Sequence, residues 1–234
     1  MPVKPKENTT NLKYPASLLF LPTERRVDEC YEVLEYLINE TKINLTVVNE
    51  EGENILYKMN ESLIRLVLDK PDVKLDINWR NSNGETLLYH TIDSYFWVPP
   101  STDFLRYLVE KKHANVNLPE HNSKRTPLHS AASRNFPGVC KYLIKQGANI
   151  ESKDEDGDTP LHLAAIGGFA KTSKDLIKLG AKVNQMNNEG NTPLHETING
   201  RHGKYRKAIL SSSNKERGGV REVFKYLIKY GANL

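Results

Sequence analysis

The chain has 234 residues, 38% hydrophobic and 26% charged, which excludes a wholly disordered protein and allows a sizeable core. Its longest apolar run, Leu18–Leu21, is too short for a membrane span or a signal peptide. Its two cysteines lack CxxC spacing, so we expect no zinc site and no disulfide framework, and the protein is expected to be cytoplasmic. The net charge of +4 is uneven: residues 1–119 carry 14 Lys and Arg against 18 Asp and Glu, and residues 120–234 carry 19 against 11.

A short motif recurs along the chain and predicts a repeat protein. Two degenerate copies come first, at Gly52–Tyr57 and Gly84–Tyr89. Three copies of Thr-Pro-Leu-His follow with a period of 33 residues, starting at Thr126, Thr159 and Thr192. Threonine is a good helix N-cap and proline suits the first helical position, so each copy predicts the start of a helix.

A second helix is predicted in each unit, ending roughly 20 residues after the motif and later than that in the last unit. Its markers are the apolar pairs Leu143-Ile144, Leu176-Ile177 and Leu227-Ile228. Gly147, Gly180 and Gly231 then stand where a left-handed C-cap would end this helix. A single turn–helix–helix unit cannot bury its apolar face alone, so the units must stack on one another.

The copy at 154–185 reads Asp-x-x-Gly-x-Thr-Pro-Leu-His-x-Ala-Ala and closes with Gly-Ala-x-Val-Asn, which resembles the ankyrin repeat family. The resemblance implies an all-α solenoid of stacked turn–helix–helix units. The expected organisation is an N-terminal tail or partial cap at 1–24 and an ankyrin-repeat domain at 25–234, with an eroded repeat at 25–48, repeats at 49–79, 80–119, 120–153, 154–186 and 187–234, and an insertion at 199–219.

Two departures from the repeat pattern are visible. Lys124 stands where the turn glycine is expected, and a positive φ there would cost about 1–2 kcal/mol. Repeat 80–119 is seven residues longer than the 33-residue period, and we expect the extra length between its two helices, at 95–100.

The recurring histidines have a structural and a catalytic or metal-binding interpretation. The resemblance implies the structural one, in which each histidine bonds to the helix-capping threonine and the adjoining loop backbone. The residues given this role are Thr126, His129, Thr159, His162, Thr192 and His195. Cys140 has no neighbouring base in the sequence and is expected to be a small buried side chain. We therefore expect no enzymatic activity, no cofactor and no metal.

The resemblance also implies a concave recognition surface, formed by the turn tips and the exposed face of each first helix. The candidate residues there alternate in charge, and they are Glu85, Asp93, Arg125, Arg134, Glu155, Asp156, Asp158 and Ile166. This alternation suits a mixed-charge peptide or a folded protein better than nucleic acid, whose phosphates favour uninterrupted Lys and Arg.

Three consecutive aromatic residues, Tyr95, Phe96 and Trp97, lie in the long connection of repeat 80–119. They cannot all face the core, and Trp and Tyr are favoured interface anchors, so we predict that they contact the partner. In the alternative, Phe96 and Trp97 fold back over the helices as a local lid.

The function predicted is non-catalytic protein–protein recognition by a monomeric adaptor or scaffold, with a partner that the sequence does not name. A first alternative is the substrate-recruiting N-terminal part of a longer, enzymatic chain, such as a bacterial effector acting in a host cytosol. A second is binding of nucleic acid or an anionic surface through insertion 199–219, which has six basic residues against Glu216. The same insertion also fits a solvated loop or a contact with an acidic protein patch.

Overall fold

The computed structural model describes residue 36 and the ranges 47–71, 73–94, 99–199 and 214–233. The chain divides into two compact units, Met1–Asp76 and Ile77–Leu234. The predicted tail at 1–24 and the aromatic segment Tyr95–Trp97 lie outside the described residues, as does most of the eroded repeat at 25–48.

The described part of the first unit holds one helical pair. The short helix η2 (Ile55–Lys58) follows Asn54, whose side chain accepts a hydrogen bond of 3.0 Å from the Leu56 N–H. The helix α2 (Glu61–Leu68) is capped in the same way by Asn60, which accepts from the Leu63 N–H at 2.9 Å. Asparagine therefore caps the first helix of this repeat, where the motif threonine is missing.

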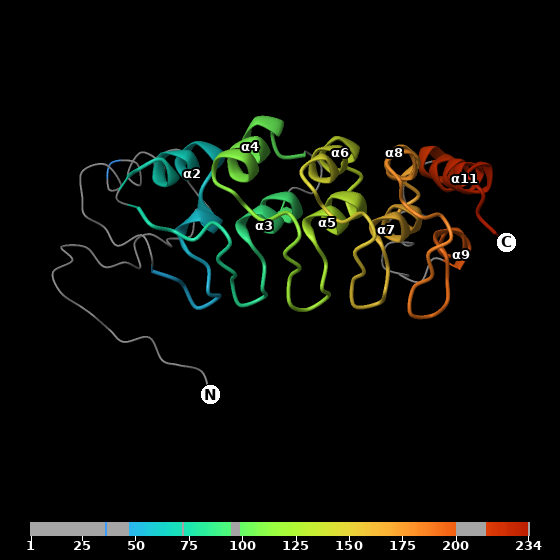
Figure 1. Ribbon diagram of the computed structural model, residues 1–234, viewed down its shortest axis with the longest axis horizontal. Coiled ribbons are helices and arrows are strands. Elements are labelled where there is room, and N and C mark those ends of the chain that lie inside the picture. Colours follow the sequence, from blue (N-terminus) through green and yellow to red (C-terminus); the bar gives the residue numbers. More distant parts are fainter. Residues whose placement is uncertain (1–35, 37–46, 72, 95–98, 200–213, 234) are drawn as a thin grey trace. The chain divides into compact units, whose positions relative to one another are not determined.

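The second unit consists of two rows of helices (Figure 1). The inner row contains α3 (Leu87–Ser94), α5 (Pro127–Ser133), α7 (Pro160–Ile166) and α9 (Pro193–Asn199). The outer row contains α4 (Thr102–Arg106) with its π-helical continuation η3 (Tyr107–Lys111), α6 (Pro137–Lys145), α8 (Ala170–Lys178) and α11 (Asn214–Lys229). Neighbours pack along each row, and each inner helix from α5 onward packs on its outer partner.

Apolar residues at the predicted positions form the core between the rows. In the outer row one leucine per helix has no exposed surface, and these are Leu108, Leu143, Leu176 and Leu227. Leu128, Leu161 and Leu194 are buried in the same way in the inner row. Among the described residues regular structure is helical, apart from two isolated β-bridges, and no described helix is long and apolar enough to cross a membrane.

The loops opposite the outer row are joined tip to tip by backbone hydrogen bonds. His121 N–H donates to the Asn83 carbonyl at 2.8 Å, and Glu155 N–H donates to the Ser123 carbonyl at 2.7 Å. One repeat further, Asn188 N–H donates to the Asp156 carbonyl at 3.0 Å. These bonds fix the spacing of the tips, so the tip side chains form a regular row.

The turn geometry is shared by all the tips, including the one without glycine. Gly84, Gly157 and Gly190 have φ values of 76°, 76° and 77°, and Lys124 has φ 56° at the equivalent position. The left-handed turn is therefore kept at Lys124, with the strain expected for a residue that carries a Cβ.

The seven extra residues of repeat 80–119 are not all between its helices, which corrects the sequence prediction. The outer-helix N-cap Ser101 lies 15 residues after Thr86, whereas Phe136 lies ten residues after Thr126. Five extra residues therefore precede α4. A sixth is accommodated in η3, where Lys112 N–H bonds to the Tyr107 carbonyl five residues back at 3.0 Å, and the seventh falls in the following loop.

Insertion 199–219 ends inside a helix. The helix α11 has 16 residues, whereas α6 and α8 have nine each. Val220 of α11 is equivalent to the N-caps of α6 and α8, Phe136 and Phe169. The helix α11 begins six residues before this position, at Asn214. An added Cβ on Gly219 would lie 2.4 Å from the Gly168 carbonyl oxygen, so the absence of a side chain lets the extended helix pass this turn.

Candidate functional site

The motif histidines bond to the threonine at each helix start, and His129 and His162 also join it to the next repeat. His129 Nδ1 lies 2.8 Å from Thr126 Oγ1 and accepts from the Thr126 N–H at 3.2 Å. Because Nδ1 is an acceptor, the ring proton is on Nε2, which donates to the Asp158 carbonyl at 3.0 Å. His162 repeats the arrangement with Thr159 and the Asn191 carbonyl, and His195 lies 2.8 Å from Thr192 Oγ1.

Burial keeps two of these rings uncharged. It lowers the pKa of His129 and of His162 to about 4, against a partial opposing effect of the hydrogen bonds to the loop carbonyls. Both rings are fully buried, and both ring nitrogens are already bonded. The arrangement positions the loops and offers no nitrogen to a metal ion or a substrate.

Tyr89 stands at the histidine position of repeat 80–119. Its N–H donates to Thr86 Oγ1 at 3.2 Å, and burial raises the pKa of its hydroxyl. Nearby, Glu85 accepts from Asn81 Nδ2 at 2.8 Å and lies 3.5 Å from His90 Nδ1. The His90 contact lowers the pKa of Glu85 more than burial raises it, so this candidate contact residue is an anion held by its own repeat.

Arg125 is held between repeats rather than free at the surface. Its Nε donates to the buried carboxylate of Asp154 at 3.2 Å. The Arg125 N–H donates to Glu120, which also accepts from Ser123 Oγ. Burial raises the pKa of Glu120, but the hydrogen bonds from Ser123, Arg125 and Asn122 outweigh it and lower the pKa. This network fixes one loop on the next.

Arg134 and Asp93 form a second inter-repeat pair. Arg134 Nε donates to Asp93 Oδ1 at 3.1 Å, and its terminal nitrogen lies 2.9 Å from Asp93 Oδ2. Ser130 Oγ donates to the same carboxylate at 2.7 Å. A two-point Arg–carboxylate contact has a defined geometry, so α3 and α5 are held in register at the ends where both candidate residues lie.

A cluster of three carboxylates, Asp154, Asp156 and Asp158, has oxygen atoms within 4.8 Å of one another. Hydrogen bonds within the array already engage two of them, Asp154 and Asp158. Asp154 Oδ1 accepts from the Asp156 and Asp158 N–H groups, its Oδ2 accepts from Arg125, and Asp158 Oδ1 accepts from Asn187 Nδ2 at 2.6 Å. The Asp156 carboxylate is the exposed member of the cluster.

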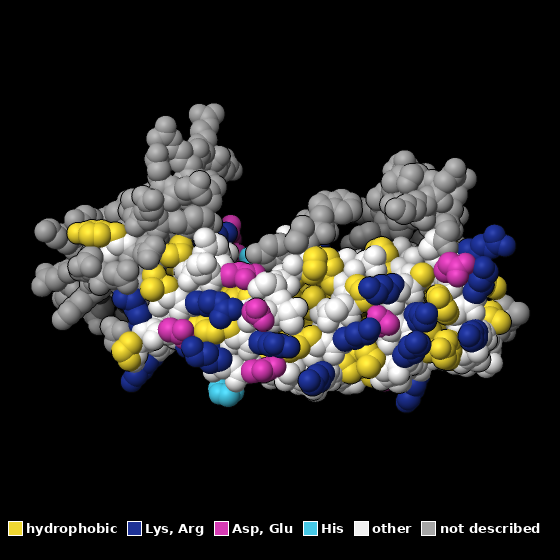
Figure 2. All heavy atoms as spheres, turned by 90° about the horizontal axis from the view of Figure 1, so that it is seen from above, with side chains coloured by type: hydrophobic (Ala, Val, Ile, Leu, Met, Phe, Trp, Pro, Cys, Tyr) yellow, Lys and Arg dark blue, Asp and Glu magenta, His cyan; other side chains and the backbone are white. Residues whose placement is uncertain are grey.

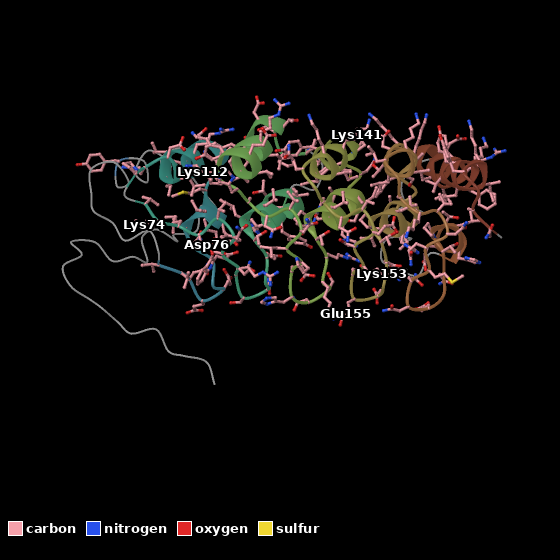
Figure 3. All side chains as sticks on the ribbon, viewed as in Figure 1. Lys74, Asp76, Lys112, Lys141, Lys153 and Glu155 are labelled. Atoms are coloured by element: carbon pink, nitrogen blue, oxygen red, sulfur yellow. The ribbon has the colours of Figure 1, made fainter. Side chains whose placement is uncertain are left out.

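The remaining candidates differ in accessibility. Glu155 and Asp156 are exposed, and Figure 3 shows Glu155 at the loop tips. Ile166, the last residue of α7, is half-buried. Asp158 is only 2% exposed, so its side chain belongs to the loop interior. The structure therefore leaves Glu155 and Asp156 as the accessible acidic pair, whereas Arg125 and Arg134 are engaged within the array.

The sequence did not reveal the inter-repeat pairs, because the position of a residue in its own repeat does not show which residues of the next repeat it contacts. Arg125 and Asp154 are 29 residues apart, and Asp93 and Arg134 are 41 apart. Aligning the repeats on their threonines leaves Arg134 one position from Asp93 but Arg125 four positions from Asp154, so the alignment brings only the first of these pairs close together. Cys140 lies where it was expected, fully buried in α6, and burial raises the pKa of its thiol to about 12.

A family model described as ankyrin repeats (3 copies) matches residues 53–154 and 138–234. The histone-lysine N-methyltransferase EHMT1 of Mus musculus is 42% identical over 52 residues, which are 22% of this chain and 4% of that protein. Alpha-latrocrustotoxin-Lt1a of Latrodectus tredecimguttatus is 39% identical over 54 residues (23% and 4%), and diacylglycerol kinase zeta of Rattus norvegicus is 28% identical over 83 residues (36% and 8%). The chain thus spans less than a tenth of these curated relatives.

A solved structure supports the fold. The crystal structure of the ankyrin repeat domain of Bcl-3, a member of the IkappaB protein family, is similar with a TM-score of 0.62 and 20% sequence identity. The match covers 84% of this chain and 76% of that chain. At this identity the likeness extends to the architecture of stacked helix pairs.

Proposed function

Because the chain belongs to the ankyrin repeat family, we propose that it is a non-catalytic recognition module that binds a protein partner. The binding surface is the loop tips together with the exposed side of the inner helices, the surface that is concave in this family. The module acts as a monomeric adaptor or scaffold in the cytoplasm.

The observation that carries the proposal is the exposed acidic pair at one tip. The carboxylates of Glu155 and Asp156 make no hydrogen bond or ion pair with another described residue. Nearby charged groups are used within the array, since Asp154 holds Arg125 and Asp93 holds Arg134. Unpaired charges on a rigid row of loops are available to a partner and set the rate and register of its binding.

The chemistry of the tips indicates the kind of partner. Lys124 is exposed one tip before the acidic pair, and Ile166 contributes apolar surface behind it. We expect a peptide or folded protein that presents basic side chains to Glu155 and Asp156 and an acidic one to Lys124. Apolar contacts, from Ile166 and from the predicted anchor Trp97, supply much of the affinity.

Affinity capture from a membrane-cleared lysate tests this surface. The tagged wild type is compared with a Glu155→Lys/Asp156→Lys variant, whose folding is checked by a circular-dichroism melt. The matched control, Asp103→Lys/Glu222→Lys, makes the same charge change on the outer helices. A protein retained by the wild type and the control and lost by the tip variant supports the proposal.

The opposite pattern would contradict it. If the tip variant keeps the protein that the control loses, the partner binds the outer helices. A separate Trp97→Ala variant tests the aromatic prediction, which lies outside the described residues, since an anchor there should lower retention without changing the melt.

A second candidate is recruitment of a substrate within a longer chain. It is favoured by the relatives, because this chain matches only 4% to 8% of their lengths and two of them are named as enzymes. In that case the same tips bind the substrate and chemistry occurs elsewhere. Sequencing the reading frame beyond residue 234 distinguishes this candidate from a free-standing adaptor.

A further inference from the structure

The outer helices carry two in-register rows of lysines. In α6, α8 and α11 one row lies two residues before the buried leucine of each helix and contains Lys141, Lys174 and Lys225. The other lies two residues after the same leucine and contains Lys145, Lys178 and Lys229. Positions i and i+4 share one face of a helix, so in each helix both lysines lie on the side away from the core. We call these six residues the lysine rows.

Among the described residues, most of this positive charge has no acidic partner. The described parts of α6, α8 and α11 (from Gly219) hold two acidic residues, and both are already paired: Asp175 with Lys141 at 3.1 Å and Glu222 with Lys225 at 2.8 Å. Six cations there form no ion pair with a described residue, and they are Lys145, Lys171, Lys174, Lys178, Arg221 and Lys229. Figure 2 shows Lys and Arg side chains spread over this surface.

We propose that the lysine rows bind an anionic lipid bilayer surface. Lysines four apart on one helix are about 6 Å from each other, and packed helices are about 8–10 Å apart, so the charges form a two-dimensional grid. A bilayer with anionic headgroups neutralises such a grid because its charges do not have to be aligned with either row. A single extended polyanion that follows one row would leave the other unneutralised.

The composition of the grid favours lipid over nucleic acid. It is made of lysines, which act as point charges, and two aromatic side chains beside it, Tyr226 and Tyr142, are already engaged. Lys174 Nζ lies 5.1 Å from the Tyr226 ring centre, and the Tyr142 hydroxyl bonds to Glu110 at 3.2 Å. The Lys174 ammonium thus covers one face of the Tyr226 ring, where a base would otherwise stack.

Exposed apolar side chains lie beside the ends of the rows. Leu179 follows Lys178, and Ile228 and Tyr230 flank Lys229. They are 41%, 40% and 41% exposed. Large apolar and aromatic residues next to lysines are typical of surfaces that enter the headgroup region of a bilayer.

This surface is separate from the one proposed for protein recognition. Figure 3 shows Lys141 on the side of the outer helices and Glu155 at the loop tips, on the opposite side of the inner row. A bilayer on the lysine rows would leave the tips free for a partner. The two proposals therefore fail independently, because different residues and different probes test them.

Vesicle co-sedimentation of the full chain tests the inference. The probes are vesicles of phosphatidylcholine alone and of phosphatidylcholine with 30% phosphatidylserine, in 50 and 200 mM salt. We expect binding only to the anionic vesicles, weakening as salt increases. Lys145→Gln/Lys178→Gln/Lys229→Gln should lower the partition coefficient about a hundredfold, since each lysine near an anionic surface contributes about a factor of five.

The matched control, Lys124→Gln/Lys153→Gln/Lys182→Gln, removes the same charge from the loops and should bind as the wild type does. Equal losses in the two variants would overturn the inference, because net charge alone would then account for binding. Absence of wild-type binding to anionic vesicles would also overturn it. So would displacement from those vesicles by equimolar duplex DNA or polyglutamate, which would assign the rows to nucleic acid or to an acidic protein.

Discussion

At the scale of single residues, Lys124 is a position where the repeat geometry overrides the side chain. Its φ of 56° is one that glycine adopts at the equivalent tips. Lys124→Gly should raise the free energy of unfolding by about 0.5–1 kcal/mol, because the gain from relieved strain exceeds the added entropy of the unfolded chain. Urea denaturation followed by circular dichroism measures this.

The equivalent residue one repeat later provides the comparison. A Cβ on Gly157 would lie 2.4 Å from Asn188 Oδ1 and 2.7 Å from the Asn188 backbone nitrogen. Gly157→Ala should therefore lower the free energy of unfolding by about 1–3 kcal/mol. A stabilising Gly157→Ala or a destabilising Lys124→Gly would show that the turn is not as tightly constrained as its geometry indicates.

The buried histidines predict how stability depends on pH. Folding lowers the pKa of His129 and His162 from about 6.5 to about 4, so the unfolded chain takes up protons first as the pH falls. The two rings therefore favour the native state above pH 6.5, and this stability is lost as the pH falls from 6.5 to 4. Each contributes a slope of about 1.4 kcal/mol per pH unit in that window.

His162→Gln should reduce this slope, because glutamine keeps a capping side chain but does not titrate. The measurement is the urea midpoint at intervals between pH 5 and 7.5. Ile144→Val, a half-buried change in α6, should instead lower stability by a similar amount at every pH. An unchanged slope in His162→Gln would mean that this ring does not titrate with the folding transition.

The sequence was informative about contacts within a repeat and poor about contacts between repeats. The Thr–His bonds follow from residues three apart at a helix start, where local geometry decides the contact. The Asp93–Arg134 pair depends on how two repeats stack, and neither residue indicates its partner. From the sequence alone, Arg125 and Arg134 are therefore interpreted as surface charges, whereas in the structure both form ion pairs with aspartates of neighbouring repeats.

At the scale of elements, the two long repeats show what periodicity could not place. The spacing of the motifs gave the number of extra residues, seven in repeat 80–119, but not their distribution. A π-turn in η3 absorbs one of them, because the turn keeps both Leu108 and Ala114 in the core although they are one residue further apart than Leu143 and Ala148. The helical end of insertion 199–219 was missed because its polar composition is also typical of a loop.

At Gly219 in the helix α11, packing and helix propensity predict opposite effects of an alanine substitution on stability. Alanine is the better helix former, but a Cβ on Gly219 would meet the Gly168 carbonyl at 2.4 Å. Gly219→Ala should lower the thermal midpoint, with a loss of about 1–3 kcal/mol. Gly138→Ala in α6, whose Cβ would have no atom within 4 Å, should instead gain about 0.5–1 kcal/mol.

The pair separates packing from propensity within one fold, and thermal melts of both variants measure it. If Gly219→Ala stabilises the protein as much as Gly138→Ala does, α11 is not tightly packed at Gly219 against the turn at Gly168.

At the scale of the whole molecule, the repeat period predicted the architecture because each unit contacts only its neighbours. The same property limits what the sequence says about function. Any exposed side chain on a regular array is a candidate until the structure shows which ones the array itself uses. In the unit Ile77–Leu234 this leaves accessible acidic residues at the loop tips and unpaired lysines on the outer helices.

Site-specific photo-crosslinking tests the central claim, that the loop tips are the recognition surface. Benzoylphenylalanine replaces Glu155 at the tip in one sample and Lys145 on the outer helices in another, and both are irradiated in a membrane-cleared lysate. A discrete protein adduct from position 155, absent from position 145, is the predicted result. An adduct from position 145 with none from position 155 would contradict the claim and place the partner on the outer helices.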